Sequence, residues 1–322
     1  GRVDHIEYLR ASPAAAGIYL TEAGDIREAG GILRNPDMAA SLRRIAEEGV
    51  EAFYEGQIAE AIVADMDRNG GLLTLADLKN AEPEETEPLW GDYRGFRIAA
   101  NPPPGGGVMV LEILNILENF DLAGMGHNSP DYIAAVAEAM KIATVDKDRH
   151  VGDPRFVDVP LERLLDKAYA KEKADAIATG EIAHVPRLQK GADQRDTTHV
   201  CAIDDAGNCV TMTHSLGMPS GVVTEGLGFM YNGCMSVFDP RPGNTGSLAP
   251  GKARFTAMAP TIVFEEDQPL LLIGAPGGTY ITMGVLQGIL NVLDFGMDAQ
   301  QAVSAPRFSA TSDIIEITNR LP

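Results

Sequence analysis

The sequence predicts an α+β fold, with most helices in the first half of the chain and most strands in the second half. Residues 36–178 carry long stretches in which apolar side chains recur at helical spacing. Residues 198–274 contain short apolar runs of alternating pattern, separated by turn residues. Helices, then strands, then helices that cover the sheet are typical of layered α+β proteins.

The first half is expected to open with helices. Asn35-Pro36-Asp37 predicts a helix start, and an approximate helical period continues through Ile62 until Asn69-Gly70-Gly71 ends it. Thr74 is expected to start a short helix. The other elements expected in this half are a connector at 81–87, a strand at 93–100, and helices at 108–120, 129–149 and 161–178.

The second half is expected to open with a β-hairpin formed by residues 198–203 and 209–213 around an Asp-rich turn. Residues 181–195 before it have turn residues and weak periodicity, which indicates an exposed, mobile linker where cleavage is tolerated. The later elements expected are strands at 227–231, 261–264 and 270–274, a tight turn at Gly277-Gly278, and helices at 280–293 and 299–303.

Composition sets the broad class of the protein. The 322 residues are 45% hydrophobic, which is enough for one large domain or two intimate ones. A net charge of -20 disfavours nucleic acid and anionic membranes as partners. No apolar run reaches the length of a membrane span. The polar start shows no secretory signal but begins with Gly rather than Met, so the cytoplasm and the periplasm both stay open.

The sequence does not predict a metal or an organic cofactor. Three cysteines are not a disulfide framework, and Cys201 and Cys209 are expected to act as small apolar side chains. The glycine run at 105–107 lacks the Lys-Ser/Thr that would follow in a phosphate loop. Three histidines lie without metal-ligand spacing, namely His127, His150 and His184.

The most informative stretch is Asp196-Thr197-Thr198-His199, directly before the hairpin. If the peptide bond before Thr197 is cut, this residue carries both a hydroxyl nucleophile and an α-amine that serves as its base. The alternative is a β-branched residue at the head of a strand, and the dipeptide alone favours that alternative.

Motifs in the same order along nearly the whole chain resemble the γ-glutamyltranspeptidase family. In the first half they are Ala52-Phe53-Tyr54-x-Gly56, Gly70-Gly71-Leu72-Leu73-Thr74, Pro102-Pro103-Pro104, Leu114-Asn115-Ile116-Leu117-Glu118 and Gly152-Asp153-Pro154-Arg155-Phe156. In the second half they are Thr197-Thr198-His199, the Asp-x-x-Gly-Asn turn, Met258-Ala259-Pro260-Thr261-Ile262-Val263, Gly274-Ala275-Pro276-Gly277-Gly278 and Ala305-Pro306-Arg307-Phe308. No single motif is decisive, but together they are highly specific.

The resemblance implies an N-terminal-nucleophile hydrolase fold, an αββα sandwich, made as one precursor that cuts itself. The cut falls between Asp196 and Thr197. It separates a mainly helical large-subunit portion, residues 1–196, from a small-subunit portion with the catalytic sheet, residues 197–322. Family members are longer at both ends, so the chain is expected to be a fragment. The resemblance implies that no cofactor is needed and that the ligand is a small-molecule amide or peptide. Whether the protein forms a homo-oligomer stays open.

The resemblance also implies roles for five residues. Thr197 attacks an acyl carbonyl, and Ser215 stands where the family has a hydroxyl that hydrogen-bonds the nucleophile. Thr213 stands at another Thr near the nucleophile. Gly277 and Gly278 match the glycines whose N–H groups hold the oxyanion. The plain alternatives are a polar strand end and an ordinary Gly-Gly turn.

The substrate pocket departs from the family pattern. Cys234 replaces a Gln and Val237 replaces the Asp that holds the α-amine of a γ-glutamyl group. Gly217 replaces an Asn that contacts this group, and Thr256-Ala257 replaces a Ser-Ser pair that contacts its carboxylate. A buried ammonium without a carboxylate is poorly compensated. We therefore expect an acyl group without a free α-amine.

The expected function is that of an autoprocessing acyltransferase or amidohydrolase, with the γ-glutamyltransferase or glutathione hydrolase as its type. His199 and His214 are alternative general bases, but the implied mechanism does not need them. The alternative from another class is an unprocessed, non-catalytic family member that binds a ligand or partner.

Overall fold

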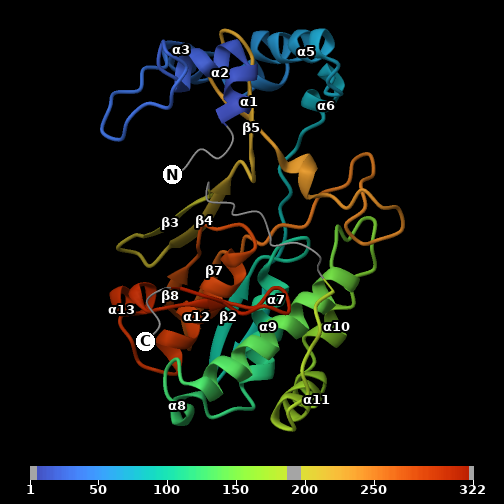
Figure 1. Cartoon of the computed structure of the whole chain (residues 1–322), viewed down its shortest axis with the longest axis vertical. Coiled ribbons are helices and arrows are strands. Elements are labelled where there is room, and N and C mark those ends of the chain that lie inside the picture. The colour runs from blue at the N-terminus through green and yellow to red at the C-terminus, as the bar shows by residue number, and fades with distance from the viewer. Residues whose placement is uncertain (1–5, 187–196, 319–322) are drawn as a thin grey trace. The chain divides into compact units, whose positions relative to one another are not determined.

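The computed structural model describes residues 6–186 and 197–318, which form two compact units (Figure 1). Unit 1 consists of the chain up to Glu85 together with Met218–Gly233, and unit 2 consists of Thr86–Gly217 and the chain from Cys234 onward. Helices and strands are mixed in both units, which is compatible with the expected α+β class. The boundary expected between residues 196 and 197 is a point of peptide-bond cleavage, not a border between compact units. It stays a prediction.

Unit 1 joins a helical segment to a two-stranded sheet from later in the chain. Its elements are α1 (Ile6–Ala11), α2 (Pro13–Tyr19), α3 (Pro36–Glu48), α4 (Glu51–Tyr54), α5 (Gln57–Asn69), α6 (Leu75–Lys79), β5 (Pro219–Val223) and β6 (Met230–Asn232). Asn35 caps α3 and also donates from Nδ2 to the Gly228 carbonyl at 2.7 Å. The Ser41 hydroxyl donates to the Leu227 carbonyl at 2.8 Å, so two distant segments share one core.

The helix expected from residue 36 through residue 62 is wrong in its continuity. The segment is broken into α3, α4 and α5 at Gly49, whose φ is +86°, and again before α5 at Gly56. The predicted start at Asn35 and the stop at Asn69 are confirmed. Thr74 forms a capping box with Asp77 at the start of α6, which confirms the short helix.

Unit 2 contains a four-stranded antiparallel sheet in the order β1-β2-β7-β8. Its strands are β1 (Leu89–Tyr93), β2 (Phe96–Ala100), β7 (Thr261–Glu265) and β8 (Gln268–Ile273). The strand expected at 93–100 is confirmed over Phe96–Ala100 as β2, but its expected start at Tyr93 is wrong. Arg94 and Gly95 have φ values of +50° and +86°, so they form a two-residue turn that folds the segment into a hairpin.

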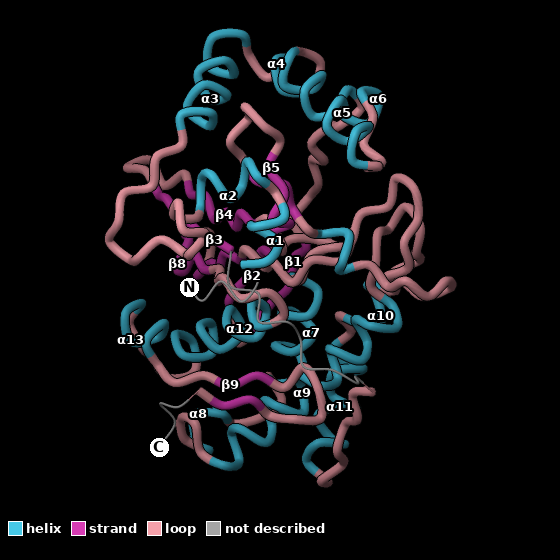
Figure 2. The backbone as a smooth tube through the Cα atoms, turned by 45° about the horizontal axis from the view of Figure 1, so that its top comes forward, coloured by secondary structure: helices cyan, strands magenta, loops and turns pink. Residues whose placement is uncertain are grey.

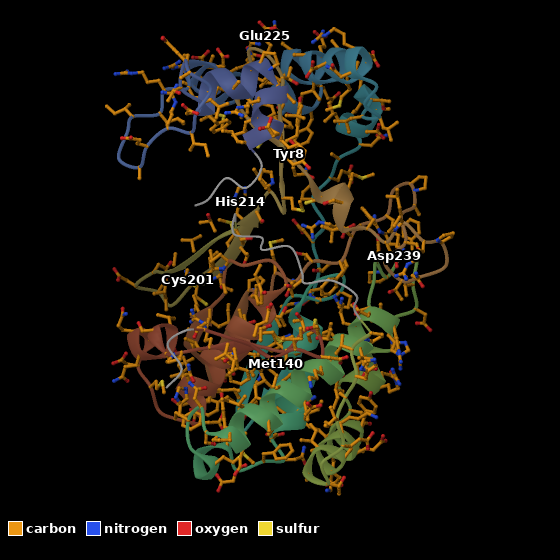
Figure 3. The ribbon with its side chains drawn as sticks, in the orientation of Figure 1. Tyr8, Met140, Cys201, His214, Glu225 and Asp239 are labelled. Atoms are coloured by element: carbon orange, nitrogen blue, oxygen red, sulfur yellow. The ribbon has the colours of Figure 1, made fainter. Side chains whose placement is uncertain are left out.

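Three helices of unit 2 shown in Figure 2 are α7 (Gly107–Leu117), α9 (Pro130–His150) and α12 (Tyr280–Leu293). Their buried side chains form the largest core of the described residues with this sheet. All residues of α7 are buried, and Met140 of α9 lies within the same core (Figure 3). The remaining elements are α8 (Leu122–Met125), α10 (Leu161–Leu164), α11 (Lys167–Ala178), the 3-10 helix η1 (Cys234–Val237), α13 (Ala299–Ser304), β9 (Phe308–Ser309) and β10 (Glu316–Ile317). The helix expected at 161–178 is split because Asp166 caps a new helix, α11.

The hairpin expected after residue 197 is confirmed as β3 (Thr197–Ile203) and β4 (Cys209–Ser215). Asp204 organises its turn by accepting hydrogen bonds from the backbone of Ala206 and Asn208. In the linker before it, residues 187–195 lie outside the described residues. The part described is not uniformly exposed, because Val185 is 1% exposed and its N–H donates to Asp313.

Candidate active site

Thr197 is the first residue of β3, and its position follows from the hairpin register. The register pairs Thr197 with Ser215, the last residue of β4, which places the two side chains on one face of the hairpin. The Thr197 Oγ1 and Ser215 Oγ atoms are 3.0 Å apart. The Gly217 N–H donates to the same Ser215 oxygen at 2.9 Å.

Gly277 and Gly278 lie between β8 and α12, and both have positive φ values, +131° and +58°. Within the described residues, neither amide group donates a hydrogen bond. The pair directly precedes the N-terminus of α12, which carries a partial positive charge. Two free amides at this end of a helix are suited to stabilising a developing negative charge.

A cavity of about 940 Å³ in unit 2 contains the hydroxyl pair and one of the glycines. Its walls come from the hairpin, from α9, from the start of α12, and from the long loop between η1 and β7. The site residues expected from the sequence that line it are Thr197, Ser215, Gly217, Val237, Thr256 and Gly278. The structure therefore brings together residues that lie up to 81 positions apart, from Thr197 to Gly278. Asp196 lies outside the described residues.

Thr213 is placed beside a histidine rather than on the cavity wall. Its Oγ1 is 2.9 Å from Nδ1 of His199, its partner in the register. On the other side of the ring, Nε2 of His199 lies 3.1 Å from Sγ of Cys201 and 3.2 Å from Oγ1 of Thr211. The expectation that Cys201 (Figure 3) is only a small apolar side chain is wrong, because it is exposed and its Sγ contacts the His199 ring.

Burial lowers the pKa of His199, which favours the neutral ring. His199 does not line the cavity that holds Thr197, and neither does His214. In the described structure, neither His199 nor His214 is therefore placed to act as the base of Thr197.

Like Thr213 and Gly277, Cys234 is a predicted site residue that does not line the cavity. Its thiol donates to the Leu216 carbonyl at 3.3 Å, and it lies directly behind Gly217. Thr256 is tied to the site by its backbone, since its N–H donates to the Pro104 carbonyl at 2.9 Å. Its hydroxyl accepts a hydrogen bond from the Met258 N–H at 3.3 Å, so the hydroxyl proton is still available for donation.

Sequence reasoning missed the charged groups of the cavity, which are Lys147, Asp148, Asp239, Arg241 and Arg254. Arg254 stands only two residues before Thr256 in the sequence. This proximity to a predicted site residue could have indicated that Arg254 lies at the cavity. Asp153 is a further support behind the wall, because it accepts from the Ala253 N–H at 2.7 Å and from the Arg155 guanidinium. Its hydrogen bonds with Arg155 lower the pKa of Asp153 to about 2.

None of the helices in the described part of the chain combines the length and apolar character needed to cross a membrane. Within the same residues, no group of three or more His, Cys, Asp or Glu side chains is arranged to hold a metal ion.

Comparison with known proteins identifies the family to which the chain is similar. The family model of γ-glutamyltranspeptidase matches residues 2–322. The chain is 40% identical over 322 residues to the acylase ACY 1 proenzyme of Pseudomonas sp. (strain V22), covering 99% of this chain and 58% of that protein. It is 37% identical over 302 residues to the glutathione hydrolase proenzyme of Escherichia coli (strain K12), covering 88% of this chain and 52% of that protein.

Among solved structures, the cephalosporin acylase from Bacillus halodurans superposes with a TM-score of 0.82 at 29% sequence identity. That match covers 98% of this chain and 63% of the acylase chain. The present chain thus spans somewhat more than half the length of the curated relatives it matches.

Proposed function

Because the chain belongs to the γ-glutamyltranspeptidase family, we propose that the protein is an autoprocessing amidohydrolase or acyltransferase in which Thr197 is the nucleophile. The observation that carries the proposal is the Thr197–Ser215 hydroxyl pair, 3.0 Å apart in the wall of a cavity that also contains Gly278. Matched relatives are named proenzymes, which supports cleavage of a precursor into two subunits. For the fold we propose the αββα sandwich of N-terminal-nucleophile hydrolases.

Processing begins with the Thr197 hydroxyl, which attacks the carbonyl carbon of Asp196. The C–N bond breaks as the new ester forms, and the nitrogen takes the proton. Water then hydrolyses the ester, which leaves the Asp196 carboxylate and a free Thr197 with both its hydroxyl and its α-amine. The hydrogen bond between the Ser215 and Thr197 hydroxyls orients the Thr197 oxygen for this attack.

The same oxygen then attacks the carbonyl of an amide substrate, and the α-amine of Thr197 takes its proton. The amides of Gly277 and Gly278 stabilise the tetrahedral oxyanion. Collapse expels the leaving amine, which receives a proton from the Thr197 ammonium, and leaves an ester on Thr197. Water or an acceptor amine attacks this ester and releases the acyl group, so no external oxidant or reductant is needed.

The acyl group is proposed to lack a free α-amine. Val237 presents an aliphatic side chain to the cavity, and both acids on the wall are already held by cations. An ammonium group in this cavity would have no free carboxylate among the described residues. If the processed full-length protein releases glutamate from a γ-glutamyl anilide with high efficiency, this part of the proposal is wrong.

Denaturing electrophoresis of the full-length protein tests the nucleophile. Wild-type protein is expected to give two fragments, with Thr197 at the N-terminus of the smaller one by mass spectrometry, and Thr197→Ala to give one uncut chain. Thr198→Ala is the matched control, because Thr198 is exposed on the opposite face of β3, and this variant should be cut normally. A wild-type protein that stays intact would favour the binding-protein alternative.

A further inference from the structure

The β3–β4 hairpin carries a second group of reactive side chains, on the same face as Thr197 but nearer to the turn. The register pairs His199 with Thr213 and Cys201 with Thr211, so these four side chains share that face. Among the described residues that line the cavity, none of the four is present. The hairpin therefore has a thiol, an imidazole and two hydroxyls together outside the cavity.

The His199 ring is held in this group by contacts at both nitrogens. Its Nε2 atom lies 3.1 Å from Sγ of Cys201, and its Nδ1 atom lies 2.9 Å from Oγ1 of Thr213. A Cβ atom at Gly274 would lie 2.1 Å from Cε1 of the ring, so only glycine there leaves room for the imidazole. A nucleophile, a base within hydrogen-bond reach and a third group that holds the base are the parts of an activated nucleophile.

The two main groups differ in exposure, and the difference suits this chemistry. Cys201 is exposed, so a small reagent can reach its sulfur, whereas His199 is half-buried. Burial lowers the pKa of His199, so the ring is mostly neutral at pH 7 and can accept a proton. A thiol with the ordinary pKa of about 8.5 is only about 3% thiolate at pH 7, so its reactions gain from a nearby base.

We propose that Cys201 is a reactive thiol activated by His199, and that it forms mixed disulfides with low-molecular-weight disulfides. Sγ of Cys201 is the nucleophile, Nε2 of His199 takes its proton, and Thr213 holds the ring through Nδ1. The site is separate from the proposed acyl-transfer site, because neither Thr197 nor the cavity takes part in the reaction.

In the proposed step, His199 takes the thiol proton of Cys201 while Sγ attacks one sulfur of the disulfide. The new S–S bond forms as the old S–S bond breaks, and the leaving thiolate receives the proton from His199. The Cys201 sulfur is oxidised and the leaving sulfur is reduced, so the low-molecular-weight disulfide is the oxidant and no other reagent is needed.

The other two thiols of the chain favour an external partner for Cys201. Cys209 lies diagonally across the hairpin, because the register pairs it with Ile203. Diagonal neighbours in a sheet lie about 7–8 Å apart, whereas Cα atoms joined by a disulfide lie about 4.4–6.8 Å apart. Cys234 belongs to η1, outside the hairpin, and its thiol donates to the Leu216 carbonyl. A mixed disulfide is therefore favoured over a bond to either thiol.

Reaction with hydroxyethyl disulfide, an uncharged low-molecular-weight disulfide, tests the inference on wild-type protein. Full-length protein, cut or uncut, is treated at pH 7, and peptide mapping by mass spectrometry follows the adduct on each of the three cysteines. N-acetylcysteine is the reference for an unassisted thiol. Cys201 is expected to react about 5- to 30-fold faster than this reference, since a thiol that is about 3% ionised can gain at most about 30-fold. A Cys201 rate at or below that of N-acetylcysteine overturns the inference.

Variants of the hairpin test the role of the base. His199→Gln should slow the reaction of Cys201 by at least about fivefold, because an amide does not take the thiol proton. His214→Gln is the matched control and should react at the wild-type rate, because His214 is exposed on the opposite face of β4. An unchanged rate in His199→Gln, or equal slowing in His214→Gln, overturns the inference.

A second pair of variants keeps the role of the base testable if His199→Gln does not fold. Thr213→Val removes the hydroxyl beside Nδ1 of His199 and should slow the reaction of Cys201, whereas Thr213→Ser keeps the hydroxyl and should restore the rate. Thermal unfolding of each variant shows that the rates are compared between folded proteins. Equal rates in Thr213→Val and wild-type protein contradict the assigned arrangement of the three groups.

Discussion

Removing the Ser215 hydroxyl gives the sharpest test of how the site is built. Ser215 Oγ lies 3.0 Å from Thr197 Oγ1 and accepts from the Gly217 N–H at 2.9 Å. Ser215→Ala removes both hydrogen bonds at once. The first orients the proposed nucleophile, and the second fixes the turn that follows β4.

The two losses have different sizes and different consequences. A neutral hydrogen bond contributes about 1 kcal/mol, and a bond to a group that develops charge contributes about 1.5–3 kcal/mol. If Ser215 acts on the charged transition state of processing, Ser215→Ala should slow cleavage by about 10- to 100-fold, at about 1.4 kcal/mol per factor of ten. The unpaired amide of buried Gly217 should lower the free energy of unfolding by about 1–2 kcal/mol.

The assay follows the appearance of the small fragment with time on denaturing gels, using freshly synthesised full-length protein. Thermal unfolding of the same samples measures the stability term separately. Ser215→Thr is the control, because it keeps the hydroxyl at the same position and should process at a rate near that of wild type.

The reasoning is refuted if Ser215→Ala is cut at the wild-type rate. It is also refuted if Ser215→Thr is as slow as Ser215→Ala, because the hydroxyl would then not be the group that matters.

Two further predictions concern buried carboxyl groups of unit 2. Burial, and then Asp146, raise the pKa of Glu112 well above its ordinary value of 4.5, so only the folded state keeps the proton and stability falls as pH rises above that value. Glu112→Gln should therefore raise the free energy of unfolding relative to wild type. The difference should grow by up to about 1.4 kcal/mol per pH unit above pH 4.5, until the folded-state pKa is reached. Denaturant titrations at several pH values measure this difference, and a difference that does not change with pH would contradict the prediction. Asp153→Asn should lower the free energy of unfolding by about 2–3 kcal/mol at neutral pH, because it weakens the hydrogen bonds to Arg155 and Ala253. The Asp153 pKa is lowered, so the wild-type advantage should vanish as pH falls from 3.8 towards about 2 in the same titrations, and an advantage that persists there would contradict the assignment.

Local rules were enough to predict the elements that frame the site. Asn35 and Thr74 each cap the helix that follows them, and the alternation after residue 197 predicts the hairpin. Once the hairpin forms, its register sets Thr197 opposite Ser215, because pairing in a hairpin depends only on the turn and the strands. This part of the candidate site is encoded within a stretch of nineteen consecutive residues, Thr197 to Ser215.

The turn at Arg94 shows where such rules failed. A non-glycine residue at φ +50° is uncommon, and here Arg94 is held by Asp294, 200 positions away, at 2.6 Å. The alternating pattern at 93–100 therefore favoured a single strand. In the folded protein, the Arg94–Asp294 ion pair helps to hold the turn of the β1–β2 hairpin.

By itself, then, the sequence determined the helix starts, the hairpin, the Thr197–Ser215 pairing and the resemblance to a family. Only the tertiary structure decided which charged groups line the cavity together with Thr197, because the cavity wall is assembled from α9, the hairpin, the 234–258 loop and the start of α12. Whether Arg254 is paired or free depends on where the acids of these separate segments lie after packing. Periodicity and capping rules cannot predict this pairing, because each of them relates residues within one or two turns of a helix.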